Sequence, residues 1–314
     1  MKKILITGSA GFIGYHLSKV LSKKNKVIGI DSFERKKFNK ISRDRISDLR
    51  GNKNFKFIRL SITNLKKMEK LFKNNYFDIV INLAAIPGVR ESFINPDIYF
   101  KNNIEGFYNI YMLSIKNKVK LFLFGSSSSV YGNNKNLNTD NPISFYASTK
   151  KCNEIIAHSF LLNSKMKIVG LRFFTVYGPW GRPDMAVYKF SNNIKNQKKI
   201  NVYNFGNHSR DFSYIDDVVN SIELIIKNKK KLKNYQILDI GKGKTDKLNY
   251  LILLIQKYFN TRINIKKISK QLGDVEITKA NIKKLIKITN YSPNTSLTTG
   301  IERFVKWYKI YHKN

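Results

Sequence analysis

The stretch TGSAGFIG, residues 7–14, decides the fold of this chain. It follows the apolar run KILIT at 3–7 and begins a helical pattern, so it reads as a turn from a buried strand into a helix. Gly8, Gly11 and Gly14 allow the backbone to turn tightly, to approach a bound group closely and to pack helix against strand. The N–H groups at the start of such a helix attract anions. A glycine triplet alone is a weak signal, but in this context it predicts a site for the pyrophosphate of a dinucleotide.

The chain continues from this turn as an alternation of short apolar runs and longer helical patterns. Candidate strands lie at 3–7, 26–30, 55–59, 78–84, 120–125 and 167–174. Candidate helices lie near 12–23, 64–73, 96–116 and 145–164. Nearly continuous apolar strands that alternate with helices predict an α/β fold with a doubly wound parallel sheet, the Rossmann arrangement.

After about residue 175 this rhythm loosens into loops that contain glycine and proline. Further helices are expected near 185–196, 216–228, 247–259 and 297–311. We therefore expect a dinucleotide-binding Rossmann domain at 1–174 and a smaller, mainly substrate-binding C-terminal lobe at 175–314. Some segments of the lobe could return to the Rossmann sheet.

Asp31 ends the second predicted strand, seventeen residues after Gly14. A carboxylate about 20 residues beyond the glycine turn binds the adenine ribose hydroxyls of a dinucleotide. An ordinary aspartate that caps a turn is the alternative. Because a carboxylate repels a 2′-phosphate, Asp31 favours NAD over NADP, although the basic residues at 35–37 leave that choice open.

The composition indicates a globular protein with a strongly basic surface. The formal net charge is +37, and 47 of the 58 basic residues are lysines scattered along the chain. A nucleic-acid site would more often cluster its charge and use arginine, so we expect no specific nucleic-acid partner. Cys152 is the single cysteine, which excludes an internal disulfide. No apolar run approaches the ~18 residues of a membrane span, and we expect a soluble cytoplasmic protein with no membrane partner.

A tyrosine and a lysine four residues apart suggest catalysis. Tyr146 and Lys150 in SFYASTK (144–150) share one face of a predicted helix, and SSSSVYG (126–132) lies upstream. A free tyrosine has a pKa of ~10, and bringing it to neutrality takes roughly 4 kcal/mol in favour of phenolate. The Lys150 ammonium and an oxidised nicotinamide are two cations that could provide it. Tyr146 would then accept a proton from a sugar hydroxyl, with a serine hydroxyl from 126–129 holding the substrate oxygen. A surface Tyr/Lys pair is the alternative.

Six stretches together carry a family resemblance. They are TGSAGFIG, NLAAIPGVRES, SSSSVYG, YASTK, GLRFFTVYGPWGRPDMAVYKF and RDFSYIDDVV. The chain resembles the extended short-chain dehydrogenase/reductases over its whole length, and within them the UDP-glucuronate 4-epimerases. The resemblance implies an isomerase that uses tightly bound NAD, oxidises a UDP-sugar at C4 to a transient 4-keto intermediate and reduces it on the opposite face. It also implies a homodimer that packs helices near 96–116 and 145–164.

The resemblance also assigns site residues. The catalytic residues it implies are Ser127, Tyr146 and Lys150. The cofactor contacts it implies are Gly8, Gly11, Phe12, Ile13, Gly14, Asp31, Leu83, Ala84, Ala85, Asn103, Tyr146 and Lys150. The substrate contacts it implies are Arg90, Ser128, Ser129, Thr175, Arg182, Tyr203, Arg210 and Asp274. It implies no metal. For Arg182 and Arg210, which would meet the uronate sugar and the diphosphate, a surface ion pair is the alternative.

One position bears on the choice of reaction. Related dehydratases and decarboxylases carry an acidic residue before Val-Tyr-Gly, where this chain has Ser129. Dehydration needs an acid and a base beyond the tyrosine, and a hydroxyl accepts a substrate carboxylate that a glutamate would repel. This favours interconversion of UDP-glucuronate and UDP-galacturonate. A UDP-hexose 4-epimerase or a UDP-glucuronate decarboxylase is the alternative, and a non-catalytic NAD- or RNA-binding protein is a remote one. Three positions depart from the family pattern. Ser61 in place of an aspartate and the loop SFERKKF at 32–38 affect the adenine end and the choice between NAD and NADP, and AAIPGV at 84–89 affects the sugar wall.

Overall fold

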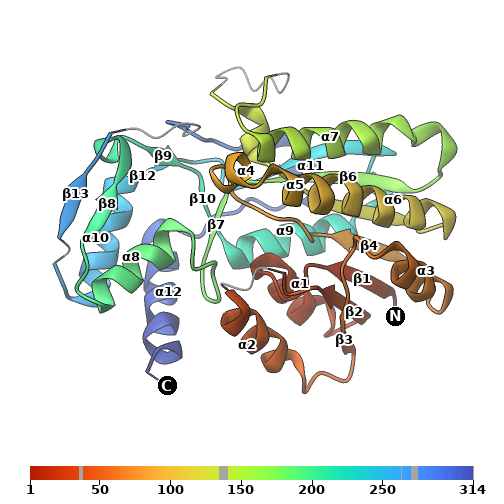
Figure 1. The fold of residues 1–314 in the computed structure, drawn as a ribbon, viewed down its shortest axis with the longest axis horizontal. Coiled ribbons are helices and arrows are strands. Elements are labelled where there is room, and N and C mark those ends of the chain that lie inside the picture. Colours follow the sequence, from red (N-terminus) through yellow and green to blue (C-terminus); the bar gives the residue numbers. More distant parts are fainter. Residues whose placement is uncertain (35–37, 134–140, 263, 270–274, 314) are drawn as a thin grey trace. The chain divides into compact units, whose positions relative to one another are not determined.

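The computed structural model describes residues 1–34, 38–133, 141–262, 264–269 and 275–313 (Figure 1). The chain divides into two compact units. The first unit comprises Met1–Phe173 and Ile222–Leu238, and the second comprises Phe174–Ser221 and Asp239–Asn314. The backbone therefore passes from one unit to the other at three points.

A seven-stranded sheet organises the first unit, in the order β11-β6-β5-β4-β1-β2-β3. Its strands are β1 (Lys3–Thr7), β2 (Lys26–Asp31), β3 (Phe55–Arg59), β4 (Ile79–Asn82), β5 (Leu121–Ser127), β6 (Lys167–Phe173) and β11 (Tyr235–Ile240). Strands β1 to β6 pair in parallel. The order reverses at β1, which is the doubly wound arrangement. The predicted Rossmann fold is confirmed.

Strand β11 is not among the six predicted strands. Its sequence YQILDI is only partly buried over its first three residues, so it lacks the continuous apolar run of a central strand. It lies at the outer edge of the sheet beside β6, where one flank has no neighbour and burial is weaker. The predicted strand at 78–84 also ends early, at Asn82, because the next residues pass over the glycine turn.

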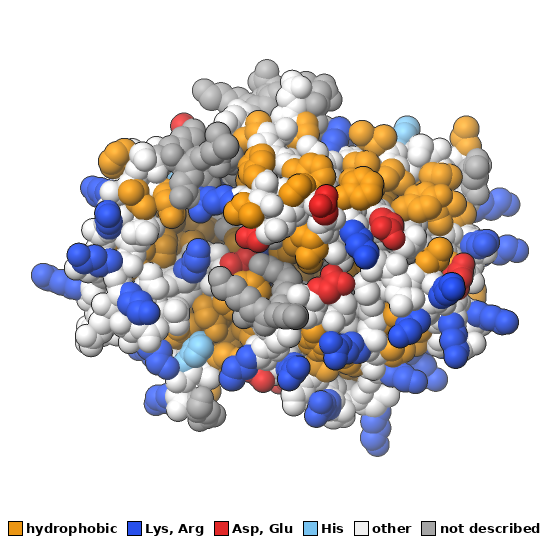
Figure 2. Space-filling model, in the orientation of Figure 1, with side chains coloured by type: hydrophobic (Ala, Val, Ile, Leu, Met, Phe, Trp, Pro, Cys, Tyr) orange, Lys and Arg blue, Asp and Glu red, His pale blue; other side chains and the backbone are white. Residues whose placement is uncertain are grey.

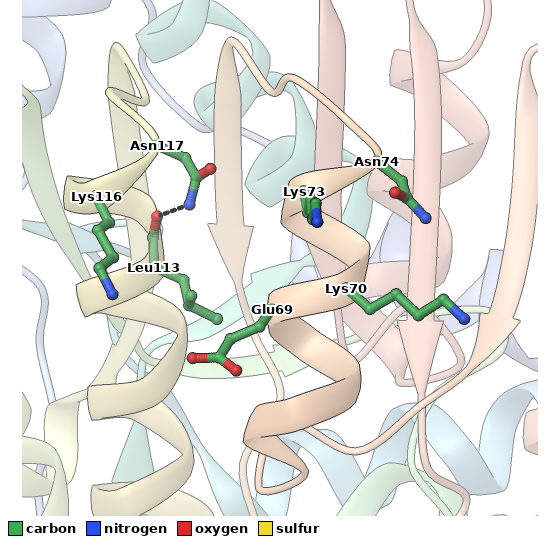
Figure 3. A pocket seen from close by; sticks show the side chains of 7 residues that line it. All are labelled: Glu69, Lys70, Lys73, Asn74, Leu113, Lys116 and Asn117. Atoms are coloured by element: carbon green, nitrogen blue, oxygen red, sulfur yellow. Dashed lines mark hydrogen bonds between the residues drawn. The ribbon is translucent and has the colours of Figure 1, made fainter.

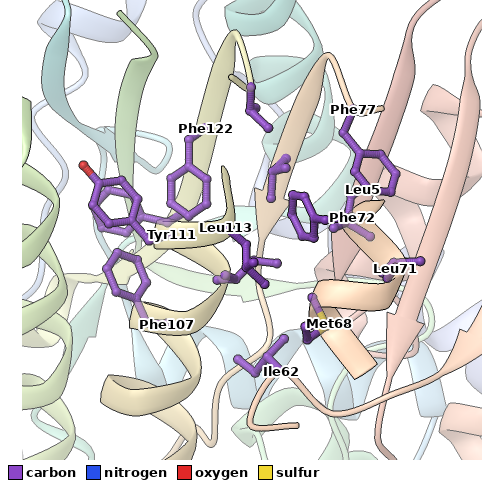
Figure 4. Close-up of a cluster of buried hydrophobic side chains, with 14 of the residues drawn as sticks. Leu5, Ile62, Met68, Leu71, Phe72, Phe77, Phe107, Tyr111, Leu113 and Phe122 are labelled. Atoms are coloured by element: carbon purple, nitrogen blue, oxygen red, sulfur yellow. The ribbon is translucent and has the colours of Figure 1, made fainter. Parts of the chain in front are cut away.

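Helices pack on the sheet and enclose an apolar core. The longer ones in this unit are α1 (Phe12–Leu21), α2 (Asn39–Leu49), α3 (Leu65–Lys73), α6 (Gly106–Lys116) and α7 (Phe145–Ser159). The shorter ones are α4 (Glu91–Ile94), α5 (Pro96–Tyr99), η3 (Ser128–Tyr131), η4 (Leu161–Asn163) and η6 (Lys229–Lys231). Figure 4 shows Phe72, Phe107 and Phe122 in the core between the sheet and helices α3 and α6. Phe107 lies edge-to-face against Phe122 at 6.0 Å, an arrangement that aromatic pairs prefer.

The segment predicted as one helix, 96–116, is helical over its whole length but is not a single α-helix. It consists of α5, a π-helical segment η2 (Phe100–Glu105) and α6. A π-helical turn holds an extra residue and is frequent at functional sites. Here it contains Asn103, whose amide is bonded inside the unit. Helix α2 was also not predicted, because only Ile41, Ile46 and Leu49 give it an apolar face.

The second unit is built from small sheets and amphipathic helices. Its strands are β7 (Thr175–Tyr177), β8 (Ile200–Val202), β9 (Ser209–Arg210), β10 (Phe212–Tyr214), β12 (Asp246–Lys247) and β13 (Ile265–Lys267). Its helices are α8 (Ala186–Lys195), η5 (Tyr203–Gly206), α10 (Leu248–Phe259), α11 (Lys283–Thr289) and α12 (Leu297–Tyr311), and α9 (Ile215–Lys227) runs across the boundary. Phe304 and Tyr308 on α12 are buried and pack with Tyr188 of α8.

Lysine and arginine side chains are spread over the visible face of the molecule, as a solvated lysine-rich surface predicts (Figure 2). Among the described residues, no helix combines the length and the hydropathy needed to cross a bilayer.

Candidate active site

The glycine turn brings β1, α1 and the loop after β4 into close contact. Gly8 has a φ of +70°, which favours glycine. A Cβ at Gly8 would lie 2.8 Å from the N atom of Ala84, and a Cβ at Gly14 would collide with the carbonyl oxygen of Gly8. The N-cap of α1 is Gly11, which has no side chain to bond the first N–H groups of the helix, and such groups can bind an anion. Phe12 and Ile13 are the first residues of this helix.

Asp31 lies beside this turn at the end of β2. Its Oδ2 accepts a hydrogen bond from the N–H of Ala10 (3.2 Å), and its Oδ1 accepts one from Phe33 (3.0 Å). Burial raises the pKa of Asp31, while these two N–H groups and the charge of Arg45 act to lower it. A half-buried carboxylate next to a glycine turn fits the ribose hydroxyls of NAD and disfavours a 2′-phosphate.

Arg45 is a feature that the sequence interpretation missed. It projects from α2, is 3% exposed and donates from Nη1 to the carbonyl oxygen of Ala10 (2.9 Å). Ala10 thus binds Asp31 through its N–H and Arg45 through its carbonyl. An arginine in a polar helix gives no sign in the sequence that it is buried.

The loop after β4 is fastened to the sheet and to the helices. Leu83 donates to the carbonyl oxygen of Thr7 (3.2 Å), and Ala84 donates to Thr7 Oγ1 (3.0 Å). The side chain of Asn103 accepts from the N–H of Ile86 (2.7 Å) and donates to the carbonyl oxygen of Ile86 (3.0 Å). It also donates to Thr149 Oγ1 (3.2 Å). The structure therefore gives Asn103 a role in fixing this loop against α7. Ala85, between Ala84 and Ile86, is partly buried.

Ser127, Tyr146 and Lys150 come from two neighbouring elements. Ser127 is the last residue of β5, and its Oγ accepts from the N–H of Ser129 (3.1 Å) at the start of η3. Tyr146 and Lys150 lie one turn apart near the start of α7, which Ser144 caps. The Nζ of Lys150 lies 5.9 Å from the centre of the Tyr146 ring. The lysine and the phenol are therefore on the same side of the helix, as their spacing predicts.

The surroundings of Lys150 bear on its charge. Its side chain is almost fully buried, and Nζ donates to the carbonyl oxygen of Gly125 (2.8 Å) in β5. Burial lowers the pKa of Lys150 from 10.5 to about 8. The ammonium therefore still predominates at pH 7, and its proton is lost far more readily than that of an exposed lysine.

Two residues that were not predicted position Tyr146. The N–H of Tyr146 donates to Ser92 Oγ (3.0 Å), and Ser92 in turn donates to the carbonyl oxygen of Val89 (2.6 Å). The Tyr99 ring lies edge-to-face against the Tyr146 ring at 6.3 Å. Both residues are far from Tyr146 in sequence, so spacing could not reveal them.

The other predicted substrate contacts divide between the two units. In the first unit Ser128 and Ser129 lie in η3, and Arg90 is exposed at the start of α4. In the second unit Thr175 begins β7 and Tyr203 begins η5. Asp274 lies outside the described residues.

The two arginines predicted to bind the substrate, Arg182 and Arg210, have partners within the second unit. Arg182 makes a two-pronged ion pair with Asp184, at 3.0 Å from Nε and 2.7 Å from Nη2. Arg210 donates from Nη1 to the carbonyl oxygens of Ser209 (3.1 Å) and Glu276 (2.8 Å). Arg182 is therefore ion-paired within its own loop, and its predicted contact with the sugar stays a prediction.

A pocket of about 660 Å³ lies elsewhere in the first unit, at the ends of α3 and α6 (Figure 3). It is lined by Glu69, Lys70, Lys73, Asn74, Leu113, Lys116 and Asn117. None of the predicted site residues lines it. Among the described residues, no group of three or more His, Cys, Asp or Glu side chains is arranged to bind a metal.

Known proteins match this architecture over the whole chain. The chain is 34% identical to UDP-glucuronate 4-epimerase of Thermodesulfobacterium geofontis, over 97% of this chain and 95% of that protein. It is similar to the crystal structure of UDP-glucuronic acid 4-epimerase from Bacillus cereus in complex with UDP-glucuronic acid and NAD, with 32% identity, a TM-score of 0.91 and coverage of 99% and 100%. It is also similar to UDP-glucose 4-epimerase of Thermotoga maritima with UDP-glucose, with 28% identity, a TM-score of 0.88 and coverage of 98% and 99%.

The match to a family model completes the assignment. The model of the NAD dependent epimerase/dehydratase family matches residues 4–241, which span the glycine turn, Asp31 and the tyrosine–lysine pair. The predicted family and its cofactor, NAD, are confirmed. The chain belongs to the NAD dependent epimerase/dehydratase family.

Proposed function

We propose that this protein is a UDP-uronate 4-epimerase that interconverts UDP-glucuronate and UDP-galacturonate. The observation that carries the proposal is the position of Lys150, whose Nζ lies 5.9 Å from the centre of the Tyr146 ring and donates to Gly125 of β5, the strand that ends in Ser127. Relatives that are named as UDP-glucuronate 4-epimerases and align over nearly the whole chain support the choice of sugar.

The three side chains divide the proton chemistry. Tyr146 as phenolate accepts the proton of the sugar C4 hydroxyl and later returns it. Lys150, held by the carbonyl of Gly125, places its ammonium beside the phenol, where a positive charge favours the phenolate form of Tyr146. Ser127 donates to the C4 oxygen and fixes its distance from Tyr146. Bound NAD supplies the acceptor and donor of the hydride at C4.

The sugar preference rests on hydroxyls and arginines. Ser128 and Ser129 follow Ser127 directly and offer hydroxyl donors where an acidic residue would repel a uronate. In this proposal Arg182 and Arg210 bind the uronate and the diphosphate, with Thr175 and Tyr203 as further contacts. Arg182 would exchange Asp184 for the substrate carboxylate, a like-for-like replacement of one two-pronged partner by another.

The test is the product formed from UDP-glucuronate. Purified protein is incubated with UDP-glucuronate, and the sugar nucleotides and carbon dioxide are measured. UDP-galacturonate without loss of carbon dioxide supports the proposal. Release of carbon dioxide identifies a decarboxylase instead. Conversion of UDP-glucose but not of UDP-glucuronate identifies a UDP-hexose 4-epimerase, the alternative that the Thermotoga maritima structure favours.

We also propose that the protein forms a homodimer through α5, η2, α6 and α7. Apolar side chains exposed on these elements are Ile98, Phe100, Tyr108 and Ile155. Figure 2 shows apolar side chains gathered over the part of the first unit where α6 and α7 lie. Ile155→Glu should give a monomer in analytical ultracentrifugation. Leu253→Glu, at an equally exposed position on α10, is the matched control and should leave the dimer intact. A parent that sediments as a monomer contradicts the proposal.

A further inference from the structure

A buried ion pair lies one helical turn beyond Lys150. Glu154 on α7 and Arg172 on β6 have side chains that are 4% and 12% exposed. Arg172 donates to Glu154 from Nε (2.8 Å to Oε1) and from Nη2 (2.6 Å to Oε2). This two-pronged geometry is the strongest form of a charge-assisted hydrogen bond.

The pair is bonded to the strand that ends in Ser127. Ser126 Oγ donates to Glu154 Oε1 (2.6 Å), and Ser126 is the register partner of Arg172 across β5 and β6. Lys150 of the same helix donates to the carbonyl oxygen of Gly125. Helix α7 is therefore hydrogen-bonded to two successive residues of β5, Gly125 and Ser126. The residue that follows these two is Ser127.

The pair also contacts the chain on the other side of Ser127. The guanidinium of Arg172 lies 4.6 Å from the centre of the Tyr131 ring, in cation–π contact. Tyr131 ends η3, the turn that Ser127 caps. Glu154 and Arg172 therefore fix the chain both before and after Ser127, and they act on the serine through Ser126 on one side and Tyr131 on the other.

Stability alone is a weak reason for this arrangement. Removing two charges from water costs several kcal/mol per ion, and well-packed apolar side chains are often as stable as a buried ion pair. An apolar pair, however, would neither accept the hydrogen bond of Ser126 nor make the cation–π contact with Tyr131. The ion pair instead holds the end of β5 in one conformation through its contacts with Ser126 and Tyr131.

We propose that Glu154 and Arg172 are positioning residues that set the Ser127 hydroxyl relative to Tyr146 and Lys150. The inference rests on the proposed function, in which Ser127 holds the sugar oxygen. Because misplacement of a reacting group by about 1 Å can cost on the order of 100-fold in rate, loss of the pair should lower kcat on that scale. KM and the amount of bound NAD should change little, since the pair is bonded to β5 and η3 rather than to the glycine turn.

The kinetic experiment uses Arg172→Met, with Arg172→Lys as the conservative variant. Arg43→Met, an exposed arginine on α2, is the matched control for loss of one charge. We expect kcat to fall on the order of 100-fold in Arg172→Met, to recover partly in Arg172→Lys and to stay at the parent value in Arg43→Met. A lower melting temperature with unchanged kcat would assign the pair a structural role only and overturn the proposal.

A cycle with Ser127→Ala tests whether the effect passes through the serine. In the Ser127→Ala background, Arg172→Met should cost little further activity, because there is no hydroxyl left to misplace. An equal loss in both backgrounds refutes the proposed route.

A crystal structure of Arg172→Met separates this proposal from the proposed function. Displacement of Ser127 Oγ relative to Tyr146 supports the positioning role whichever sugar the parent converts. An unmoved Ser127 refutes it even in an enzyme that is fully active on UDP-glucuronate. Absence of turnover by the parent on any UDP-sugar counts against the proposed function alone.

Discussion

Replacing Lys150 by methionine should stabilise the protein while it removes activity. The side chain is almost fully buried, and burial lowers its pKa from 10.5 to about 8. At 1.36 kcal/mol for each pH unit, the difference corresponds to a cost of about 3 kcal/mol for keeping the ammonium in the folded state. Methionine removes that cost and is similar in length. Loss of the hydrogen bond to Gly125 costs about 1 kcal/mol. We therefore expect the free energy of unfolding to rise by about 2 kcal/mol net at pH 7.

The effect should depend on pH with a definite sign. Between pH 8 and 10.5 the unfolded chain binds the Lys150 proton and the folded chain has released it, so the stability of the parent rises with pH. The full cost is present below pH 8 and is gone above pH 10.5. The advantage of Lys150→Met over the parent should therefore shrink as the pH rises through this window.

The measurement is urea unfolding of parent and variant at pH 7 and at pH 10. Lys116→Met, an exposed lysine on α6, is the control and should show no comparable gain. A Lys150→Met variant that is less stable than the parent at pH 7 would refute the conclusion that burying the ammonium destabilises the protein. A difference in unfolding free energy that does not change with pH would refute it as well.

Three further variants test the site. Tyr146→Phe should lower turnover at least 100-fold, because it removes the proton acceptor, with NAD retained on the purified protein; a loss within tenfold would exclude Tyr146 from the mechanism. Gly14→Ala should lower the free energy of unfolding by about 1–3 kcal/mol and abolish most NAD binding, since the new methyl group meets the carbonyl of Gly8. An unchanged melting temperature would contradict that contact. Arg45→Met should weaken NAD binding measured by calorimetry on stripped protein, whereas Arg43→Met on the same helix should not; equal affinities in the two variants would remove Arg45 from the cofactor site.

The parts of the fold that have local signals could be predicted from the sequence. The six predicted strands are short and mostly apolar, and the glycine turn, Asp31 and the Tyr146/Lys150 spacing each have a short-range pattern with a physical reason. Strand β11 has no such run, because it is an edge strand that is buried only over its second half. The π-helical turn at 100–105 was equally hidden, because an extra residue in one turn leaves the apolar period almost intact.

The parts of the site that depend on tertiary register could not be predicted. Glu154 and Arg172 meet only because β5 and β6 pair with Ser126 opposite Arg172. Arg45 reaches Ala10 only because α2 packs beside α1, and its charge marks it as a surface residue by composition. In both cases a long polar side chain is buried by a contact between elements that are distant in the sequence.

The edge strand β11 has a consequence for how the molecule is made. The first unit receives Ile222–Leu238 only after residues 174–221 have been synthesised. A nascent chain of about 175 residues leaving the ribosome would therefore carry the nucleotide-binding half with β6 unprotected, open to pairing with any other extended chain. Recombinant fragments that stop at residue 173 should aggregate for the same reason, and a soluble half-molecule would need the later strand spliced back onto its edge.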